Sequence, residues 1–176
     1  MIEDFFSFLS PLLLIVIPIY ISNGTALLFG GGKALDFNKN FFDSRPIFGP
    51  GKTFKGTFAG IFFGTIGGIL VSFLFPEFSS LLGVNYIIFA FLLASGAMIG
   101  DITSSFAKRR LGKERGSKSR LLDRLDFLIG GLILGAVFFI PSIEQLIILG
   151  ILTFVIHKIG NVLAFKTKLK KVPWWF

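Results

Sequence analysis

The sequence predicts an all-α, polytopic membrane protein with about five transmembrane helices, and three observations support this prediction. Of its 176 residues, 53% are hydrophobic and only 16% are charged, whereas soluble domains carry about 25% charged residues. The mean hydropathy is +0.79. The apolar residues also lie in long runs, and a helix of roughly 20 apolar residues crosses the hydrocarbon core of a bilayer. Most of the chain is therefore expected to lie in lipid.

Apolar runs define the expected spans, which lie at about 5–22, 55–75, 86–107, 123–140 and 143–164. Pro76 follows the second span and Pro141 follows the fourth. Each span should be an unbroken helix, because lipid offers the backbone no hydrogen-bonding partner. We expect residues 1–176 to form a single membrane-embedded domain with two long loops, 23–54 and 108–122.

The charged residues indicate how the chain is oriented. All 18 lysines and arginines lie in the two long loops, the C-terminal tail and the adjoining helix ends. The N-terminus and the two short loops have no basic residue, and their acidic residues are Glu3, Asp4, Glu77 and Glu144. Because basic loops stay on the cytoplasmic side, we expect the N-terminus outside and the C-terminus in the cytoplasm. The expected location is the cell membrane, with the active site facing the cytoplasm.

The composition limits the kinds of site that the chain can form. It has no cysteine and a single histidine, His157, so thiolate chemistry and histidine-rich metal sites are excluded. The net charge of +8 favours anionic partners, such as nucleotide phosphates, lipid phosphates or a membrane surface. Nucleic acid is not expected, because the basic residues lie beside membrane spans. The basic tail from Lys166 to Lys171, with Trp174 and Trp175, should anchor the chain to membrane lipids.

Glycines recur at helical spacing in the expected spans. The second span has one every four residues, at Gly56, Gly60, Gly64 and Gly68. The pairs Gly96 and Gly100, and Gly131 and Gly135, repeat this spacing. Glycines on one helix face allow another helix to approach closely. We therefore expect a tight bundle, in which these faces join helices of one chain or of two chains in a homo-oligomer.

Three carboxylates are candidates for a metal site near the inner surface. Asp101 lies inside the third span, about 10 Å from that surface at a rise of 1.5 Å per residue, and carboxylates at such depth usually have a function. Asp123 and Asp126 share one face at the start of the fourth span. Oxygen ligands without His or Cys favour Mg²⁺. The alternatives are a structural pair of Asp101 with a lysine, and compensation of a helix dipole by Asp123 and Asp126.

Basic residues beside these carboxylates are candidates for phosphate binding. Lys108, Arg109 and Arg110 end the third span, and Lys113 follows them. The alternative is an ordinary positive-inside loop. Asn23, at the inner end of the first span, could read a base or cap the helix.

The segment before the second span contains Gly51, Lys52 and Thr53, a sequence like the end of a P-loop. A P-loop would need glycine where this chain has Pro46, so a P-loop NTPase is excluded. Lys52 and Lys55 could still hold phosphates at a helix N-terminus. Together, these groups predict Mg²⁺-dependent phosphoryl or nucleotidyl transfer to a lipid.

The order of the motifs resembles that of the CTP-dependent phosphatidate cytidylyltransferases. The matching motifs are Ser105-Phe-Ala-Lys-Arg-Arg110, then Lys113, then Asp123-Arg-Leu-Asp126. The Lys-Asp and His-Gly-Gly elements of the bacterial pattern are missing. The short chain is more similar to the archaeal branch, the CDP-archaeol synthases. That similarity lies in residues 18–23, 28–32, 36–43, 51–53 and 100–101.

The resemblance implies transfer of CMP from CTP to 2,3-bis-O-(geranylgeranyl)-glycerol 1-phosphate, with Mg²⁺ and release of pyrophosphate. It implies that Asp101, Asp123 and Asp126 hold the metal and, together with Lys108, form the catalytic set. The expected nucleotide-binding residues are Asn23, Lys52, Thr53, Lys55, Lys108, Arg109, Arg110 and Lys113.

Two other functions stay open at this point. A CTP-dependent polyprenol or lipid kinase would transfer the γ-phosphoryl group to an alcohol, and would need a base near that hydroxyl. A small membrane transporter would use Asp101 as a coupling-ion site, although the short outer turns argue against a pathway through the bundle.

Overall fold

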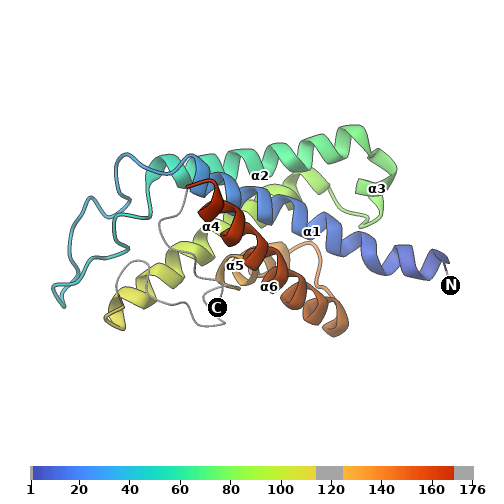
Figure 1. Ribbon diagram of the computed structural model, residues 1–176. Helices are drawn as coiled ribbons and strands as arrows, with labels where there is room; N and C mark the ends of the chain where they lie inside the picture. The colour runs from blue at the N-terminus through green and yellow to red at the C-terminus, as the bar shows by residue number, and fades with distance from the viewer. Residues whose placement is uncertain (1, 114–124, 169–176) are drawn as a thin grey trace.

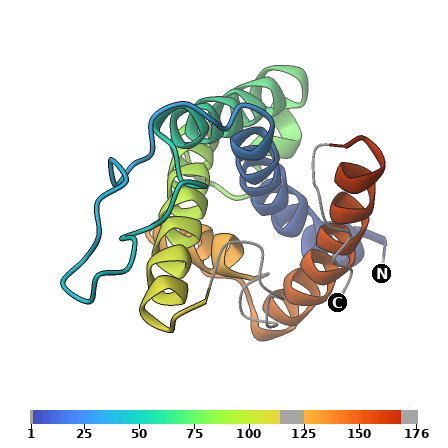
Figure 2. The ribbon, with the colours of Figure 1, turned by 60° about the vertical axis from the view of Figure 1, so that its left-hand side comes forward.

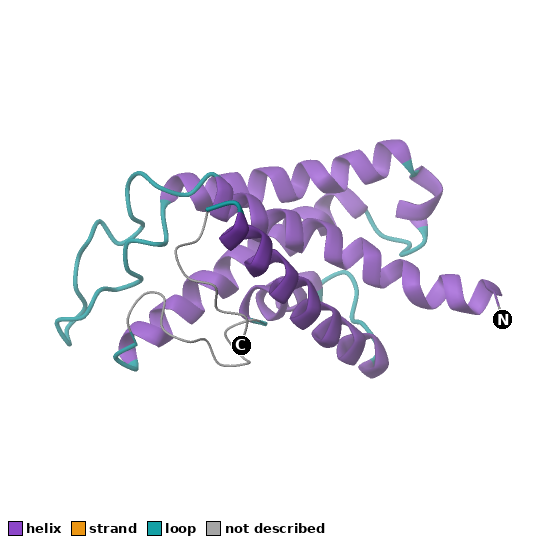
Figure 3. Cartoon of the chain, viewed as in Figure 1, coloured by secondary structure: helices purple, strands orange, loops and turns teal. Residues whose placement is uncertain are grey.

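The computed structural model describes residues 2–113 and 125–168, and these residues form a helical bundle (Figures 1 and 3). Its helices are α1 (Ile2–Leu28), α2 (Phe54–Leu74), α3 (Pro76–Ser80), α4 (Tyr86–Arg110), α5 (Asp126–Gly135) and α6 (Ile143–Lys166). Within the described residues, β pairing is limited to two isolated bridges, Ala34 with Thr53 and Asn40 with Pro46. The predicted all-α class is confirmed.

Four helices in the described residues are long and apolar enough to cross a membrane, and they are Phe6–Leu28, Phe54–Leu74, Tyr86–Arg110 and Ile143–Gly160. The expected span at 123–140 is not among these four helices. Within its described residues the helix is α5, which has 10 residues. A helix of this length is about 15 Å long, which is half the thickness of the hydrocarbon core. The chain turns at residues 136–138 and continues without regular secondary structure to Pro141. Residues 123 and 124, and most of the predicted C-terminal anchor, lie outside the described residues.

The first helix is longer than the expected span 5–22. It continues through Asn23 and Gly24 to Leu28, because its last turns pack against the start of α2. The Thr25 hydroxyl donates to the Ile21 carbonyl at 2.6 Å, and Phe29 N donates to the Thr25 carbonyl at 2.9 Å. Asn23 therefore lies within the helix and does not cap its end.

Helix α4 lies at the centre of the bundle, against α5, α2 and α1. Buried residues from α1, α4, α5 and α6 form the apolar core. Prominent among them are Leu14, Ile15, Ile19, Phe89, Leu93, Phe127 and Leu149. Helix α6 packs mainly on α1, and Figure 2 shows it at one side, away from α2 and α4.

The predicted glycine faces are the contact surfaces of this bundle. A methyl group on Gly60, Gly64 or Gly68 of α2 would lie less than 3.0 Å from Met98, Ala94 or Ala90 of α4, respectively. On the other side of α4, a methyl group on Gly96 or Gly100 would collide with the backbone of α5. The close packing expected from the spacing is confirmed, and it is used here between helices of one chain.

Basic segments of the described chain lie together at one end of the bundle (Figure 1). The loop 29–53, the first turn of α2 and the last turn of α4 carry basic residues at one end, whereas Glu77 and Glu144 lie at the other. We call the first of these the loop end.

Substituting Gly100 with alanine should destabilise the bundle. The new methyl group would lie less than 3.0 Å from the Asp126 carbonyl oxygen, which is backbone and cannot rotate away. Overpacking of this kind costs about 1–3 kcal/mol. Thermal unfolding of the purified protein in detergent should show a lower midpoint. Gly150→Ala is the matched control, because no atom lies within 4 Å of the position of its methyl group. Equal midpoints for the two variants would contradict the packing account.

Candidate active site

A cavity of about 730 Å³ lies at the loop end of the bundle. Its walls come from α1, the segment 51–53, the first turn of α2, α4, α5 and α6. Four residues that the sequence singled out line it, namely Asn23, Lys52, Thr53 and Asp101. The structure thus brings the first loop and the third predicted span together, although 49 positions separate Lys52 from Asp101.

Lys52 and Asp101 form an ion pair on the wall of this cavity. The Lys52 Nζ donates to Asp101 Oδ2, and the two side chains are 21% and 24% exposed. The Lys52 backbone is held by short-range pairing of the loop, since its carbonyl accepts from Leu35 N at 2.8 Å. Thr53 is buried and caps α2, and its Oγ1 accepts from Gly56 N at 3.1 Å. The helix start is therefore fixed where the lysine enters the cavity.

A second carboxylate–lysine pair lies at the contact between α4 and α5. Lys108 Nζ is 3.5 Å from Asp126 Oδ2. Asp126 also accepts from Phe127 N at 2.8 Å through Oδ1, and the Ser104 hydroxyl hydrogen-bonds to its carboxyl group. Asp101 and Asp126 interact electrostatically across this contact, because Gly100 allows the start of α5 to approach α4 closely.

These two carboxylates can serve as oxygen ligands for a magnesium ion. Magnesium in nucleotide enzymes is bound by one or two carboxylates together with waters and substrate phosphates, and Asp101 and Asp126 supply such a donor set. No group of three or more His, Cys, Asp or Glu side chains that could hold an ion occurs in residues 2–113 and 125–168. The third predicted ligand, Asp123, lies outside the described residues.

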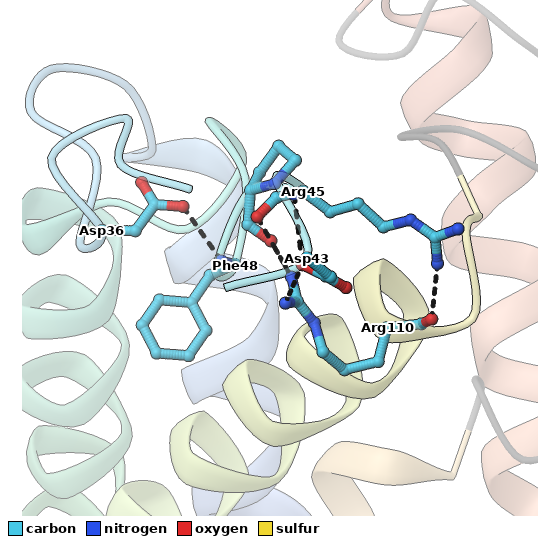
Figure 4. Close-up of polar contacts among 6 residues, drawn as sticks. Asp36, Asp43, Arg45, Phe48 and Arg110 are labelled. Carbon is cyan, nitrogen blue, oxygen red and sulfur yellow. Dashed lines mark hydrogen bonds and ion pairs between the residues drawn. The ribbon is translucent and has the colours of Figure 1, made fainter. Parts of the chain in front are cut away.

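Arg110 binds the loop 29–53 instead of lining the cavity (Figure 4). Its Nη1 donates to Asp43 Oδ1 at 2.6 Å, and its Nη2 donates to the carbonyls of Arg45 and Pro46. In return, Arg45 Nη1 donates to the Arg110 carbonyl at 2.6 Å. The guanidinium also lies over two phenylalanine rings, Phe41 and Phe106. This set fastens the loop to the end of α4.

The other predicted phosphate-binding residues lie around the cavity without lining it. Arg109 approaches Gly49 of the loop, and its buried Nε has no hydrogen-bond partner among the described atoms. Lys55 is exposed on the first turn of α2, and Lys113 is half-buried just after α4.

Asp36 organises the loop, a role that the sequence analysis did not assign to it. Its buried carboxylate accepts from Asn38 N at 3.0 Å, Phe48 N at 2.9 Å and Gly49 N at 2.7 Å. Burial raises the pKa of Asp36, but these amide hydrogen bonds outweigh it and hold the pKa of the carboxyl group below its ordinary value. Such an acceptor for backbone amides leaves no periodic signal in a sequence. Its one trace in the sequence was the segment 36–43, which is among those that carry the family resemblance.

One lysine–carboxylate pair lies on the cavity wall and a second lies at the contact between α4 and α5. Ionisable residues inside a membrane bundle and beside a cavity indicate a functional site. Comparison with known proteins defines the family. The family model for CarS-like CDP-archaeol synthases matches residues 5–174. The chain belongs to the CDP-archaeol synthase family. This confirms the predicted family and enzyme class, a CTP-dependent nucleotidyltransferase.

Curated relatives cover nearly the whole chain. The CDP-archaeol synthase of Methanocaldococcus jannaschii is 40% identical over 97% of this chain and 99% of its own length. The Pyrococcus horikoshii enzyme is 43% identical over 90% of this chain and 93% of its own. A solved structure of an intramembrane enzyme for archaeal membrane lipid biosynthesis superposes with a TM-score of 0.76 and 30% identity, covering 85% of this chain and 92% of that one. These matches agree with a multi-pass membrane enzyme.

Replacing Asp36 with asparagine should destabilise the protein at neutral pH and reduce its acid sensitivity. Because the pKa of Asp36 is lowered on folding, its stabilisation is complete above about pH 4 and is lost as the pH falls through the folded-state pKa. Hydrogen bonds to a charged acceptor contribute about 1.5–3 kcal/mol each. Thermal midpoints of the wild type and Asp36→Asn should differ at pH 7, and the difference should shrink as the pH falls below about 4. A difference that stays constant over this range would contradict the assignment.

Proposed function

We propose that this protein transfers CMP from CTP to 2,3-bis-O-(geranylgeranyl)-glycerol 1-phosphate, forming a CDP-linked ether lipid and pyrophosphate. One observation carries the proposal: the cavity joins Lys52 and Asp101 to an apolar wall at the end of a membrane bundle. A site for a nucleotide and a lipid headgroup needs cations, carboxylates and access from the bilayer. The names of the relatives, CDP-archaeol synthase, support the same reaction.

The reaction needs little proton transfer from the protein. The lipid phosphate is already an anion, and one of its oxygens attacks the α-phosphorus of CTP in line. A new phosphorus–oxygen bond forms, the bond between the α-phosphorus and the bridging oxygen breaks, and pyrophosphate leaves. Positioning and charge stabilisation then supply most of the rate enhancement. Magnesium, when bound, would neutralise the charge that develops on these oxygens.

Each residue in and around the cavity has a separate role in this reaction. Asp101 and Asp126, with Asp123, would hold the metal ion. Lys52 would turn from Asp101 to a phosphate, while Thr53 keeps the start of α2 in place beside it. The Lys52–Asp101 ion pair neutralises both charges. A bound metal ion would compensate the negative charge of Asp101, and a nucleotide phosphate would compensate the positive charge of Lys52. Both charges would therefore stay compensated when the ion pair opens.

The remaining predicted residues surround this centre. Lys108, next to Asp126, would bind the phosphates on the α5 side and help to stabilise the transferred group. Asn23, on the α1 wall, would read the cytosine base. Lys55, Arg109 and Lys113 would attract the nucleotide by long-range charge, and Arg110 would act through the loop that it holds.

We further infer that the loop end faces the cytoplasm of a cell membrane and that the N-terminus lies outside. The basic residues in the loop 29–53, the first turn of α2 and the last turn of α4 support this orientation. Membrane lipids surround the bundle, and nucleic acid is not a partner. A homo-oligomer stays a prediction, since the glycine faces proposed for it are occupied by helices of the same chain.

Labelled CTP distinguishes this reaction from the alternatives. The purified protein, in detergent with Mg²⁺ and the lipid phosphate, is incubated with CTP labelled at the α- or the γ-phosphorus. We expect the α-label in the lipid extract and the γ-label in pyrophosphate. The γ-label in the lipid, with a polyprenol as acceptor, would instead identify a kinase. No labelled lipid with either substrate would favour the transporter.

Neutralising Asp101 or Asp126 should abolish most of the activity. Asp101→Asn and Asp126→Asn are each expected to lower kcat by about 100-fold or more, as for the loss of a group that stabilises transition-state charge. Each should also raise the Mg²⁺ concentration required for half-maximal rate. Glu77→Gln, at the opposite end of the bundle, is the control and should retain the wild-type rate. Wild-type activity in both aspartate variants would remove the metal assignment.

A further inference from the structure

A row of phenylalanine side chains runs along one side of α2. Phe54, Phe58 and Phe62 recur every four residues, which places them on the same side of the helix, and all three are exposed. The rings of Phe58 and Phe62 stack, with their centroids 6.1 Å apart. Because α2 is long and apolar enough to cross a membrane, exposed rings on it contact lipid. The row begins at Phe54, in the first turn of α2 at the loop end.

The loop 29–53 extends this row beyond the helix. Phe37 is 52% exposed, and its ring centroid lies 5.4 Å from that of Phe54. The Lys33 Nζ lies over the Phe37 ring, 4.5 Å from the centroid. Segments at a membrane surface combine lysines with apolar and aromatic side chains, and the lysines there keep their charge at the level of the headgroups. We call Lys33, Phe37 and Phe54 the surface patch.

The backbone at Phe37 indicates that its ring has a function. Its φ of +52° lies in the left-handed region, which is an outlier for a bulky residue and costs free energy. Asp36 supports this turn, because its Oδ1 accepts from Asn38 N at 3.0 Å. Glycine would adopt the same conformation without strain, but it has no ring. Residues strained in this way cluster at sites that bind ligands, so we ascribe the strain to the placement of the Phe37 ring.

The charge of the surface patch favours an anionic partner. Both acids of the loop are bound within the protein, since backbone amides donate to Asp36 and Arg110 pairs with Asp43. Lys33 is exposed and lies over a ring, which attracts its charge without neutralising it. A ligand with a negative headgroup and hydrocarbon chains matches both the lysine and the row of rings. An anionic lipid of the surrounding bilayer has this chemistry.

The surface patch lies apart from the cavity, yet backbone pairing joins it to Lys52. None of its three residues is among the described residues that line the cavity. Figure 2 shows the loop beside α2 and α4, on the side away from α6. Phe54 N donates to the Lys33 carbonyl at 3.1 Å, and Leu35 N donates to the Lys52 carbonyl at 2.8 Å. The segments 33–35 and 52–54 therefore form one paired unit.

We propose that Lys33, Phe37 and Phe54 bind the anionic headgroup of a bilayer lipid, outside the catalytic cavity. The lipid phosphate lies against the Lys33 ammonium group, and the hydrocarbon chains follow the rings of α2 into the bilayer. Because the segments 33–35 and 52–54 are paired, the bound lipid also stabilises the backbone that carries Lys52. The site requires only the membrane and is independent of the proposed reaction.

Native mass spectrometry of the purified protein in detergent, titrated with phosphatidylglycerol or phosphatidylcholine, tests the site without any enzymatic reaction. We expect Lys33→Gln to weaken binding of the first phosphatidylglycerol about 5-fold, as for the loss of one lysine at an anionic surface. Binding of phosphatidylcholine should stay unchanged, and Lys33→Arg should bind both lipids as the wild type does. Lys39→Gln is the matched control, because it removes an exposed lysine of the same loop and leaves the surface patch intact.

Phe37→Gly separates lipid binding from folding. Glycine adopts a φ of +52° without strain, so the thermal midpoint in detergent should stay near that of the wild type. The affinity for phosphatidylglycerol should fall about 3-fold, because the ring beneath the lysine is lost.

Two results would overturn the proposal. Equal losses of phosphatidylglycerol affinity in Lys33→Gln and Lys39→Gln would indicate general surface charge instead of a site. Binding that Lys33→Gln leaves unchanged but Lys52→Gln abolishes would place the lipid in the catalytic cavity. A wild type that forms no CDP-lipid, yet shows the expected loss in Lys33→Gln alone, would contradict the proposed function and still support the lipid site.

Discussion

The close approach of α4 to α2 and to α5 determines where the two carboxylates of the site, Asp101 and Asp126, lie. Helices in lipid gain little from apolar contact with one another, so small residues that let backbones approach are an important source of packing energy. Glycines of α2 give α4 one neighbour, and Gly96 and Gly100 give it the other. Asp101 directly follows Gly100, which makes one of the tightest of these contacts, and this is why it lies near Asp126 at the start of α5.

Charge compensation is the second constraint. An unpaired charge at the edge of a membrane bundle costs free energy. The chain avoids this cost because a lysine lies next to each of the two carboxylates, Asp101 and Asp126. The same arrangement suits a phosphate enzyme, since each pair can open when ligands of opposite charge arrive. The loop that delivers Lys52 is itself fixed by two aspartates. Asp36 holds its backbone amides, and Asp43 ties it to Arg110.

The sequence was informative wherever the physics is periodic or composition-based. Run length and charge distribution predicted the all-α membrane class, and the four-residue spacing predicted the glycine contacts. Lys52 and Asp101, which were predicted to bind phosphate and metal, form an ion pair on the wall of one cavity. The sequence was less informative where tertiary contacts override local signals. Asn23 was predicted to lie at the end of the first span, yet packing on α2 extends α1 beyond it to Leu28.

Side-chain partners were the least predictable feature. Arg110 stands in a run of three basic residues, and nothing in that run distinguishes a phosphate ligand from the partner of Asp43. The expected span at 123–140 was apolar enough to cross a bilayer, but its helix in the described residues ends at Gly135. Hydropathy measures how a segment partitions and does not locate the turn at which the backbone leaves the helix.

The most direct test of this account is an experimental structure of the protein with CTP and Mg²⁺. The account predicts that the Lys52–Asp101 pair is broken in the complex. Lys52 Nζ should lie about 2.8 Å from a phosphate oxygen, and an Asp101 oxygen should bind the metal at about 2.1 Å. A complex with CTP bound while Lys52 still pairs with Asp101, and with no metal at Asp101, would contradict it.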